Sequence, residues 1–285
     1  MNIFLKRNIK LYFRDRTNFL ISLLAIVIVI ALYALFLGNV WGYAEIMELP
    51  DIEIVRDSWL VAGILAVATI TTSMGAFAVI VDDRTKKINK GFYASPVKRS
   101  HITAGYILSA FSIGVIMTII TAIPLGIYLV ARGASPLALT AYLQMIGVIL
   151  LSSLSSTAFV CYIVSFLKSH SAFTTASTIV GTLVGFLMGI YLPIGVLPEA
   201  VQVVMRLFPP SHAAVLLRQV VMGSAMDVTF EYVPVEHLDY FQETMGVVFH
   251  FGDFEITPLI SIMILVVSAV IFYGLSLLNM RKISK

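Results

Sequence analysis

The sequence predicts an all-α polytopic membrane protein with six transmembrane helices. Of its 285 residues, 59% are hydrophobic and 12% are charged. A soluble domain carries roughly 25% charged residues, so this chain has too little charge to cover a water-soluble fold of its length. Cys161 is the only cysteine and cannot form a disulfide within the chain. Long uncharged apolar stretches account for this composition, and we expect a single transmembrane domain over residues 1–285.

Six apolar stretches are predicted to span the membrane. None of them contains Asp, Glu, Lys, Arg or His in its interior. A helix of about 20 residues crosses roughly 30 Å of hydrocarbon. The third stretch is longer than this and contains Pro124, which predicts a kink. The predicted spans are 19–37, 59–81, 102–131, 137–167, 172–192 and 258–280.

A seventh apolar stretch, 196–222, contains charged residues and is divided by two prolines. Each half, as a helix, is about 18 Å long, which is too short to cross the membrane. We predict a re-entrant or interfacial hairpin. A kinked seventh span is the alternative, but it places the termini on opposite sides, against the charge distribution. Pairing of Glu199 with Arg206 or Arg218 would offset the cost of burying charge, and the sequence does not choose between them. The candidate gate residues are Glu199, Arg206, Pro209, Pro210, His212 and Arg218.

The basic residues are distributed unevenly between the two sides of this arrangement. With six spans both termini lie on one side, which holds 15 of the 19 Lys and Arg residues. Basic residues near span ends favour the cytoplasmic side, so both termini are predicted to be cytoplasmic. The basic stretches flank the predicted spans. We therefore expect them to set the topology and to contact lipid head groups rather than to bind nucleic acid. The acidic loops 38–58 and 223–257 then face outward. We expect the second to fold as a small cap, with a flexible acidic loop as the alternative.

Motifs for catalysis, metal binding and ATP binding are absent from the sequence. There is no His-Glu-x-x-His, no Gly-x-Ser-x-Gly and no Gly-x-x-x-x-Gly-Lys-Ser/Thr. The five histidines lack the spacing of a metal site. Ion-driven carriers usually need buried carboxylates or histidines as relays, and the predicted spans hold none. We therefore expect no enzyme activity and no cofactor in this chain. If it moves a solute, the energy comes from elsewhere.

The N-terminal segment, 1–18, is predicted to form an amphipathic helix on the cytoplasmic membrane surface. As a helix it places Leu5, Ile9, Tyr12 and Phe13 on one face, next to a basic sector. Phe4 falls outside that apolar face. A basic disordered tail is the alternative.

The loop 82–100, after the second span, is predicted to dock a partner protein. Ile88 and Phe92 are four residues apart and share one face of a short helix, surrounded by charge. Pro96 ends any such helix near Ala94. An apolar knob with a charged collar suits a groove on a partner. A solvated loop that only fixes topology is the alternative.

The fifth predicted span carries small residues at every fourth position, namely Ser177, Gly181, Gly185 and Gly189. Such a face lets another helix approach closely, so it predicts a packing seam. The partner helix belongs either to the same chain or to a second subunit, and the pattern does not distinguish them.

The order of these features resembles the type-2 permease family of ABC transporters, the membrane subunits of many bacterial exporters. The resemblance covers nearly the whole chain, beginning with the basic amphipathic start. Asp83 stands where the family often has Glu, and Thr85-Lys86-Lys87 replaces its usual Gly-Thr. The matching motifs are Asp83-Arg84, Ser95-Pro96-Val97-Lys98-Arg99, and Phe208-Pro209-Pro210-Ser211-His212-Ala213 followed by Arg218.

The resemblance implies an ATP-driven export permease for an amphiphilic substrate such as a drug, lipid or peptide. Two permease subunits, identical or homologous, pair in the membrane lipid. Each docks one of two ABC ATPase subunits, which bind ATP and Mg²⁺. The loop after the second span acts as the coupling helix, and the outer hairpins gate an exit. The alternatives are a non-transport scaffold or sensor subunit, an ion-coupled carrier, or a membrane-embedded enzyme. The coupling residues that the resemblance implies are Asp83, Arg84, Ile88, Phe92 and Pro96.

Overall fold

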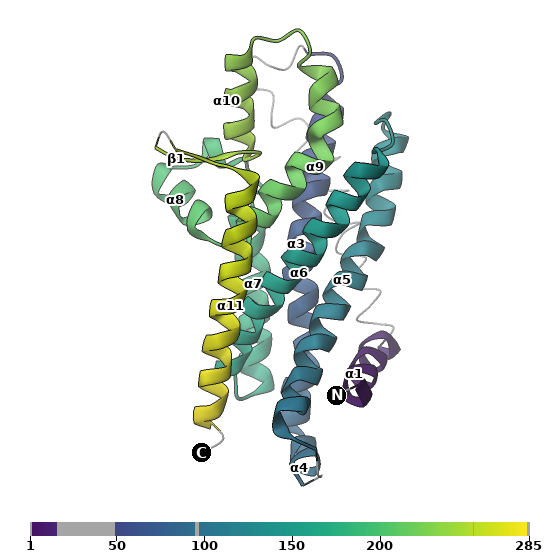
Figure 1. Cartoon of the computed structure of the whole chain (residues 1–285), viewed down its shortest axis with the longest axis vertical. Coiled ribbons are helices and arrows are strands. Elements are labelled where there is room, and N and C mark those ends of the chain that lie inside the picture. Colours follow the sequence, from purple (N-terminus) through teal and green to yellow (C-terminus); the bar gives the residue numbers. More distant parts are fainter. Residues whose placement is uncertain (1, 16–48, 95–96, 253, 284–285) are drawn as a thin grey trace.

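The computed structural model describes residues 2–15, 49–94, 97–252 and 254–283. Within these ranges the chain is almost entirely helical (Figure 1). The first predicted span, 19–37, and Pro96 of the coupling loop lie outside the described residues.

Four described helices are long and apolar enough to cross a membrane. They correspond to the second, third, fourth and last predicted spans. A fifth span arises only if the bent pair α8 (Glu199–Leu207) and α9 (Ser211–Thr229) is counted as one. Helix α7 (His170–Leu187) covers only part of the predicted span 172–192 and is not among the four. The four long helices are α3 (Ile52–Thr85), α5 (Arg99–Ala131), α6 (Leu139–Phe166) and α11 (Pro258–Ile283).

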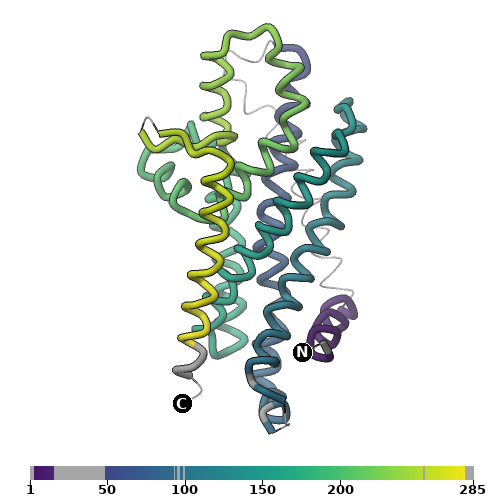
Figure 2. Tube along the Cα trace, viewed as in Figure 1, coloured from purple at the N-terminus to yellow at the C-terminus, as the bar shows by residue number. Residues whose placement is uncertain are grey.

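Helix α3 lies at the centre of the bundle and contacts α5, α6, α7 and α9. Its apolar residues occur all around the helix, which is the pattern of a helix buried on every side. Trp59, Leu65, Ile70 and Phe77 of this helix are almost fully buried. Helix α6 crosses obliquely between α5 and α11 (Figure 2), and it contacts both of them.

The two ends of the bundle differ in their elements (Figure 1). One end, which we call the α4 end, holds α1 (Asn2–Arg14), α4 (Ile88–Tyr93) and the C-terminal end of α11. The opposite half, which we call the α10 end, holds α8, α10 (Val235–Met245) and an antiparallel hairpin. Strands β1 (Phe249–Phe251) and β2 (Phe254–Ile256) form that hairpin, with Phe249 opposite Ile256. The segment 223–257 is therefore largely folded and does not match the flexible-loop alternative.

Hydroxyl groups on α6 connect it to α3 and α11. Ser156 lies 2.9 Å from the Thr69 hydroxyl of α3, and Ser155 lies 3.1 Å from the Ser268 hydroxyl of α11. In a membrane, small hydroxyl residues let helices approach closely and form hydrogen bonds between them. The Ser-rich part of α6 therefore joins three of the long helices.

Two buried ion pairs lie near the ends of α3. Asp57 is 4% exposed and accepts a hydrogen bond from Arg132 Nε at 2.9 Å, and Asp83 is 3% exposed and pairs with Arg7. These aspartates are 26 positions apart in one helix, or about 39 Å. A bilayer with its head groups is about 40–45 Å thick. The separation of the two pairs is therefore close to the thickness of a bilayer with its head groups.

The contribution of the buried Asp57–Arg132 pair to stability can be tested by substitution. Arg132→Ala leaves the Asp57 carboxylate buried without its donor, and we expect a loss of about 1–3 kcal/mol of stability. Glu53→Gln is the matched control, because Glu53 binds the same guanidinium but is 66% exposed, and it should cost less than about 0.5 kcal/mol. Thermal unfolding in detergent measures both. Adding Asp57→Asn to Arg132→Ala should restore most of the loss, and equal effects of the two single variants contradict this account.

Candidate coupling and gating sites

Asp83 connects three helices at the α4 end. The Arg7 guanidinium of α1 donates two hydrogen bonds to its carboxylate, Nη1 to Oδ2 at 2.6 Å and Nη2 to Oδ1 at 2.8 Å. The Tyr106 hydroxyl of α5 donates to Oδ2. Next to this pair, Asn8 Nδ2 donates to Ser109 Oγ of α5 at 3.2 Å. A bidentate, charge-assisted pair is among the strongest side-chain interactions. We call this group, Arg7, Asp83 and Tyr106, the α4-end clamp.

The clamp keeps Arg7 charged. The hydrogen bond to Asp83 raises the pKa of the Arg7 guanidinium above its ordinary value, and this effect exceeds the opposing effect of partial burial. Asp83 was predicted as a docking residue, but its carboxylate is inside the protein and is occupied by Arg7 and Tyr106. Asp83 therefore holds α3 against α1 and α5, and its role in coupling stays a prediction.

The predicted apolar knob of α4 is divided between two surroundings. The Phe92 ring packs edge-on against the Phe4 ring, with centroids 4.8 Å apart, and the Arg7 guanidinium lies 5.1 Å from the Phe92 centroid. Ile88 is 41% exposed, and the neighbouring Lys86, Lys87 and Lys90 are exposed as well. Of the two residues of the predicted knob, Ile88 is the exposed one, and its docking role stays a prediction. Arg84 is half-buried and lines a small cavity with Tyr106 and Ser165.

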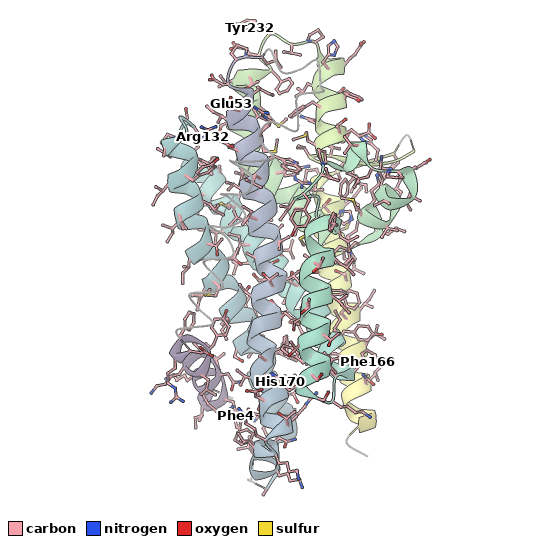
Figure 3. The ribbon with its side chains drawn as sticks, turned by 180° about the vertical axis from the view of Figure 1, so that it is seen from behind. Phe4, Glu53, Arg132, Phe166, His170 and Tyr232 are labelled. Atoms are coloured by element: carbon pink, nitrogen blue, oxygen red, sulfur yellow. The ribbon has the colours of Figure 1, made fainter. Side chains whose placement is uncertain are left out.

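Phe4 was placed outside the apolar face of the N-terminal helix, and the structure corrects this. Besides Phe92, Phe4 contacts α5 at Gly105, where a Cβ would lie 2.7 Å from Phe4 Cβ. Gly105 therefore permits the close approach of α1 to α5. Figure 3 shows Phe4 near His170 at one end of the molecule, with Glu53, Arg132 and Tyr232 near the other.

The hairpin predicted over 196–222 forms two helices that meet at 89°. Pro209 and Pro210 lie in the break between α8 and α9. His212 is 1% exposed and fixes this corner: its Nε2 lies 3.0 Å from the Arg206 carbonyl, and its Nδ1 lies 3.1 Å from Ser261 Oγ of α11. Because a carbonyl only accepts, Nε2–H donates to it and Nδ1 accepts from the serine. The ring thus joins α8, α9 and α11.

Arg218 is almost fully buried and binds backbone carbonyls rather than a carboxylate. Its Nη2 donates to Met188 O at 2.8 Å and to Gly189 O at 2.9 Å, and its Nη1 donates to Gly246 O at 3.1 Å. These carbonyls follow the C-terminal ends of α7 and α10, where helix carbonyls lack partners and the helix dipole is negative. The guanidinium also lies over the Trp59 ring of α3, 4.9 Å from its centroid. We call Arg218 and Trp59 the hairpin anchor.

Trp59 completes the hairpin anchor. Its Nε1 donates to Met245 O at 2.7 Å, one residue before the Gly246 carbonyl that Arg218 binds. Gly246 and Gly189 both have φ of +65°, which favours glycine, and each ends a helix. A Cβ on either would lie 3.0–3.2 Å from an Arg218 nitrogen. The two glycines therefore end α10 and α7 and also leave room for Arg218.

Neither alternative pairing of Glu199 is found among the described residues. Glu199 is exposed at the start of α8. Arg206 donates to Gln202 Oε1 at 2.8 Å and lies 3.9 Å from Glu243 Oε1.

Because the partners of Arg218 are backbone atoms of distant segments, no side-chain pattern in the sequence indicates them.

The glycines of the fifth span do not form one helix face. Gly189 lies beyond the end of α7, where it accepts from Arg218. A Cβ at Gly185 would meet the Tyr191 ring, and one at Gly181 would meet no described atom within 4 Å. Within the described chain these glycines serve a helix end and a local contact rather than a seam with another helix. Packing of the Gly181 face against a second subunit stays a prediction.

Comparison with known protein families assigns most of the chain to one of them. A family model described as ABC-2 family transporter protein matches residues 42–278. The matched range contains α3 to α9, α10 and most of α11, and it leaves out α1. No curated protein matches the sequence.

The hairpin anchor yields a prediction. Arg218→Gln removes the cation from three carbonyls and from the Trp59 ring, so we expect a loss of about 2–4 kcal/mol. Arg206→Gln is the matched control in the same hairpin, because its ion pair is long, and it should cost less than about 1 kcal/mol. Thermal unfolding gives the size of each effect, and amide hydrogen exchange at 245–248 should rise only for Arg218→Gln. Similar losses for both variants, or unchanged exchange, contradict the assignment.

Proposed function

This chain belongs to the ABC-2 family of transporter proteins, and from that premise we propose that it is the permease subunit of an ATP-driven exporter. Members of the family are membrane transport subunits of ABC transporters and normally work with ABC ATPase subunits. In this proposal two separate ATPase subunits bind ATP and Mg²⁺, and the chain itself catalyses no reaction. A second permease, identical or homologous, completes the transporter.

The observation that carries the proposal is the construction of the α4 end. Helix α4 lies in the connection between α3 and α5, and its Phe92 ring is held by Phe4 and Arg7 of α1. Arg7 in turn holds Asp83 of α3. A push on α4 therefore acts on α3, both directly and through α1. Ile88 stays on the surface, where an ATPase groove receives it.

The topology of the proposal follows from charge. The α4 end carries most of the basic residues near span ends, which places it in the cytoplasm of a bacterial cell, together with both termini. The proposed six spans include 19–37 and α7. Helix α1 lies along the cytoplasmic surface, and α8 and α9 enter the membrane from outside as a re-entrant hairpin.

Helix α3 connects the coupling site to the gate. Asp83 belongs to the α4-end clamp and Trp59 to the hairpin anchor, 24 positions apart in the same helix, or about 36 Å. When the ATPase subunits close on ATP, α4 and the lower end of α3 move together. Trp59 then displaces Arg218, to which the ends of α7 and α10 are bound. The outer hairpin opens an exit by this route.

The proposed substrate is amphiphilic. The exposed faces of α5, α6 and α11 carry large aliphatic side chains, among them Ile123, Leu143 and Val270. Such surfaces suit a drug, lipid or peptide that partitions into the membrane. The direction of transport in this proposal is out of the cytoplasm.

The coupling role of Ile88 can be tested with a surface substitution. Ile88→Asp places a charge where the ATPase groove expects an apolar side chain, so we expect ATPase association to weaken by about 1–2 kcal/mol, or five- to thirtyfold. Phe166→Asp is the control, because Phe166 is 53% exposed at the α4 end of α6 but lies outside α4. Co-purification with the ATPase subunit and transport-stimulated ATP hydrolysis provide the readout. If Ile88→Asp retains both, α4 is not the docking element.

A further inference from the structure

Two hydroxyl pairs join α3 to α6. The Thr69 hydroxyl lies 2.9 Å from that of Ser156, and the Ser73 hydroxyl lies 3.2 Å from that of Thr157. All four residues are buried, and we call them the hydroxyl seam. The protons of the two α3 hydroxyls bond to carbonyls of α3 itself, Thr69 to Ala66 O and Ser73 to Thr69 O. The α6 hydroxyls are therefore the donors in both pairs, and α3 supplies the acceptors.

Helix α6 carries a second pair of hydroxyls one turn before the seam. Ser152 and Ser153 precede the α6 members of the seam by four positions and are 0% exposed. Their hydroxyls have no hydrogen-bond partner among the described residues, although buried hydroxyls are nearly always bonded. Ser153 already lies close to Ser73, because both hydroxyls are within 4 Å of the point where a Cβ on Gly114 would lie. The seam therefore has an unused duplicate at the spacing of one helical turn.

A shift of α6 by one turn brings the duplicate into use. Four residues of an α-helix rise about 6 Å. If α6 advances by this distance along its own axis toward the α4 end, Ser152 takes the place of Ser156, and Ser153 takes the place of Thr157. The acceptors on α3 stay the same, so the present register and this advanced register make the same hydrogen bonds across the seam.

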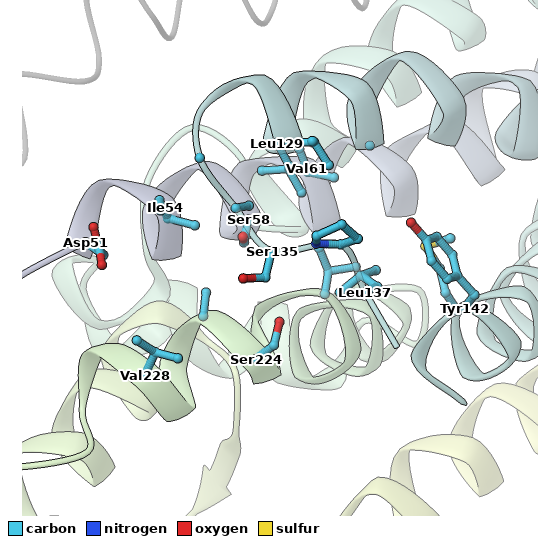
Figure 4. Close-up of a pocket in the computed structure, with 18 of the residues that line it drawn as sticks. Asp51, Ile54, Ser58, Val61, Leu129, Ser135, Leu137, Tyr142, Ser224 and Val228 are labelled. Carbon is cyan, nitrogen blue, oxygen red and sulfur yellow. The ribbon is translucent and has the colours of Figure 1, made fainter. Parts of the chain in front are cut away.

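The surroundings of α6 leave room for this shift. Protein interiors are close-packed, so a helix moves past its neighbour only where space allows repacking. A cleft of about 130 Å³ lies between the start of α6, the start of α3 and α9. Figure 4 shows Leu137 and Tyr142 lining it together with Val61 of α3. The connection 132–138 between α5 and α6 is outside any helix and can absorb a change in its span.

The hydroxyl seam separates two groups of helices that are bound internally. Helix α3 is bound to α1 and α5 by the α4-end clamp and by the Asp57–Arg132 pair. Helix α6 is bound to α11 through Ser155 and through the Asn279 amide, which donates to Ser165 Oγ at 2.8 Å. The neutral bonds of the seam are about half as strong as the charge-assisted bonds that hold α3 to α1 and α5. We therefore take α1, α3 and α5 as one unit, and α6 and α11 as the other.

Helix α9 is bound to both units. His212, in its first turn, lies 3.1 Å from Ser261 Oγ of α11. Arg218, six positions later, lies over the Trp59 ring of α3. Any movement of α11 relative to α3 therefore acts on α9 between these two residues, at the corner of the outer hairpin.

We propose that α6 moves with α11 by one helical turn past α3, and that Ser152 and Ser153 replace Ser156 and Thr157 as donors to α3. One-turn shifts of one packed element past another are a known form of protein switch. The shift is equivalent to moving α3 toward the α10 end, which is the direction of a push on α4 from the ATPase. It draws the His212 corner away from the hairpin anchor. This inference rests on the proposed export function and supplies the movement that opens the hairpin.

Disulfide trapping in the full chain, reconstituted in nanodiscs without the ATPase, tests the shift. Cys161→Ser removes the single native thiol. In this background, Thr69→Cys with Ser152→Cys reports the advanced register, because Ser152 is about 6 Å farther along α6 than Ser156. Thr69→Cys with Val160→Cys is the matched control, because Val160 is equally buried and one turn away in the opposite direction.

Two further substitutions change the balance between the registers in opposite directions. Thr157→Val removes the donor to Ser73 in the present register, and Ser153→Ala removes it in the advanced register. We expect copper phenanthroline to form the 69–152 disulfide about three- to tenfold faster with Thr157→Val, and more slowly by a similar factor with Ser153→Ala, as for one neutral hydrogen bond. The 69–160 disulfide should form slowly in every variant.

A second arm adds the ATPase subunits and a non-hydrolysable ATP analogue. The analogue should speed the 69–152 disulfide about fivefold or more, as for a typical allosteric coupling, and leave the 69–160 pair unchanged. If the ATPase does not associate with the chain, the proposed function fails, while the result for the chain alone still decides whether the shift occurs.

The proposal is overturned if Thr157→Val and Ser153→Ala change the 69–152 rate in the same direction or leave it unchanged. It is also overturned if the 69–152 and 69–160 disulfides form equally fast, which indicates general loosening of the bundle. With the ATPase bound, a 69–152 rate that does not respond to the ATP analogue separates the shift from transport and contradicts its role in opening the hairpin. Membrane insertion and monodispersity of each variant show that it is folded.

Discussion

Every charge buried along α3 must find its partner inside the protein, because neither lipid nor an apolar core solvates it. Arg7 and Tyr106 surround Asp83 at one end of the helix, and Arg132 pairs with Asp57 at the other. Asp83 holds α1 and α5 against one end of α3. Asp57 holds the C-terminal end of α5 against the other end. The same requirement therefore fixes the neighbours of α3.

Arg218 meets the requirement in another way. Its partners are carbonyls at the ends of α7 and α10, together with the Trp59 ring. A helix end also needs partners, because its last carbonyls lack hydrogen bonds within the helix. One buried cation and two helix ends thus satisfy one another. Truncating the arginine removes the donor to three carbonyls at once, which makes the hairpin anchor a cooperative unit.

The sequence predicts best what depends on local composition. The apolar runs 59–81, 102–131 and 258–280 lie within helices, and 137–167 extends past α6 by two residues at its start and one at its end. An uncharged run of this length forms a helix in a membrane. The sequence predicts least what depends on distant backbone atoms. The carbonyl partners of Arg218 leave no side-chain pattern in the sequence. A helical projection of 1–18 places Phe4 off the apolar face, because the projection does not include Phe92 and Gly105, the residues of other segments that Phe4 contacts. Gly189 fits a four-residue spacing yet ends α7 instead, since spacing alone does not show where a helix stops.

The central claim is that α3 carries a displacement from the α4-end clamp to the hairpin anchor. Hydrogen–deuterium exchange of the whole transporter, with and without a non-hydrolysable ATP analogue, measures this in the wild type and in Asp83→Asn. The account predicts that ATP changes exchange at 188–190 and 245–248 in the wild type. In Asp83→Asn this response should be lost while the ATPase stays bound, because the bidentate pair with Arg7 is broken. An undiminished response in Asp83→Asn would contradict the claim.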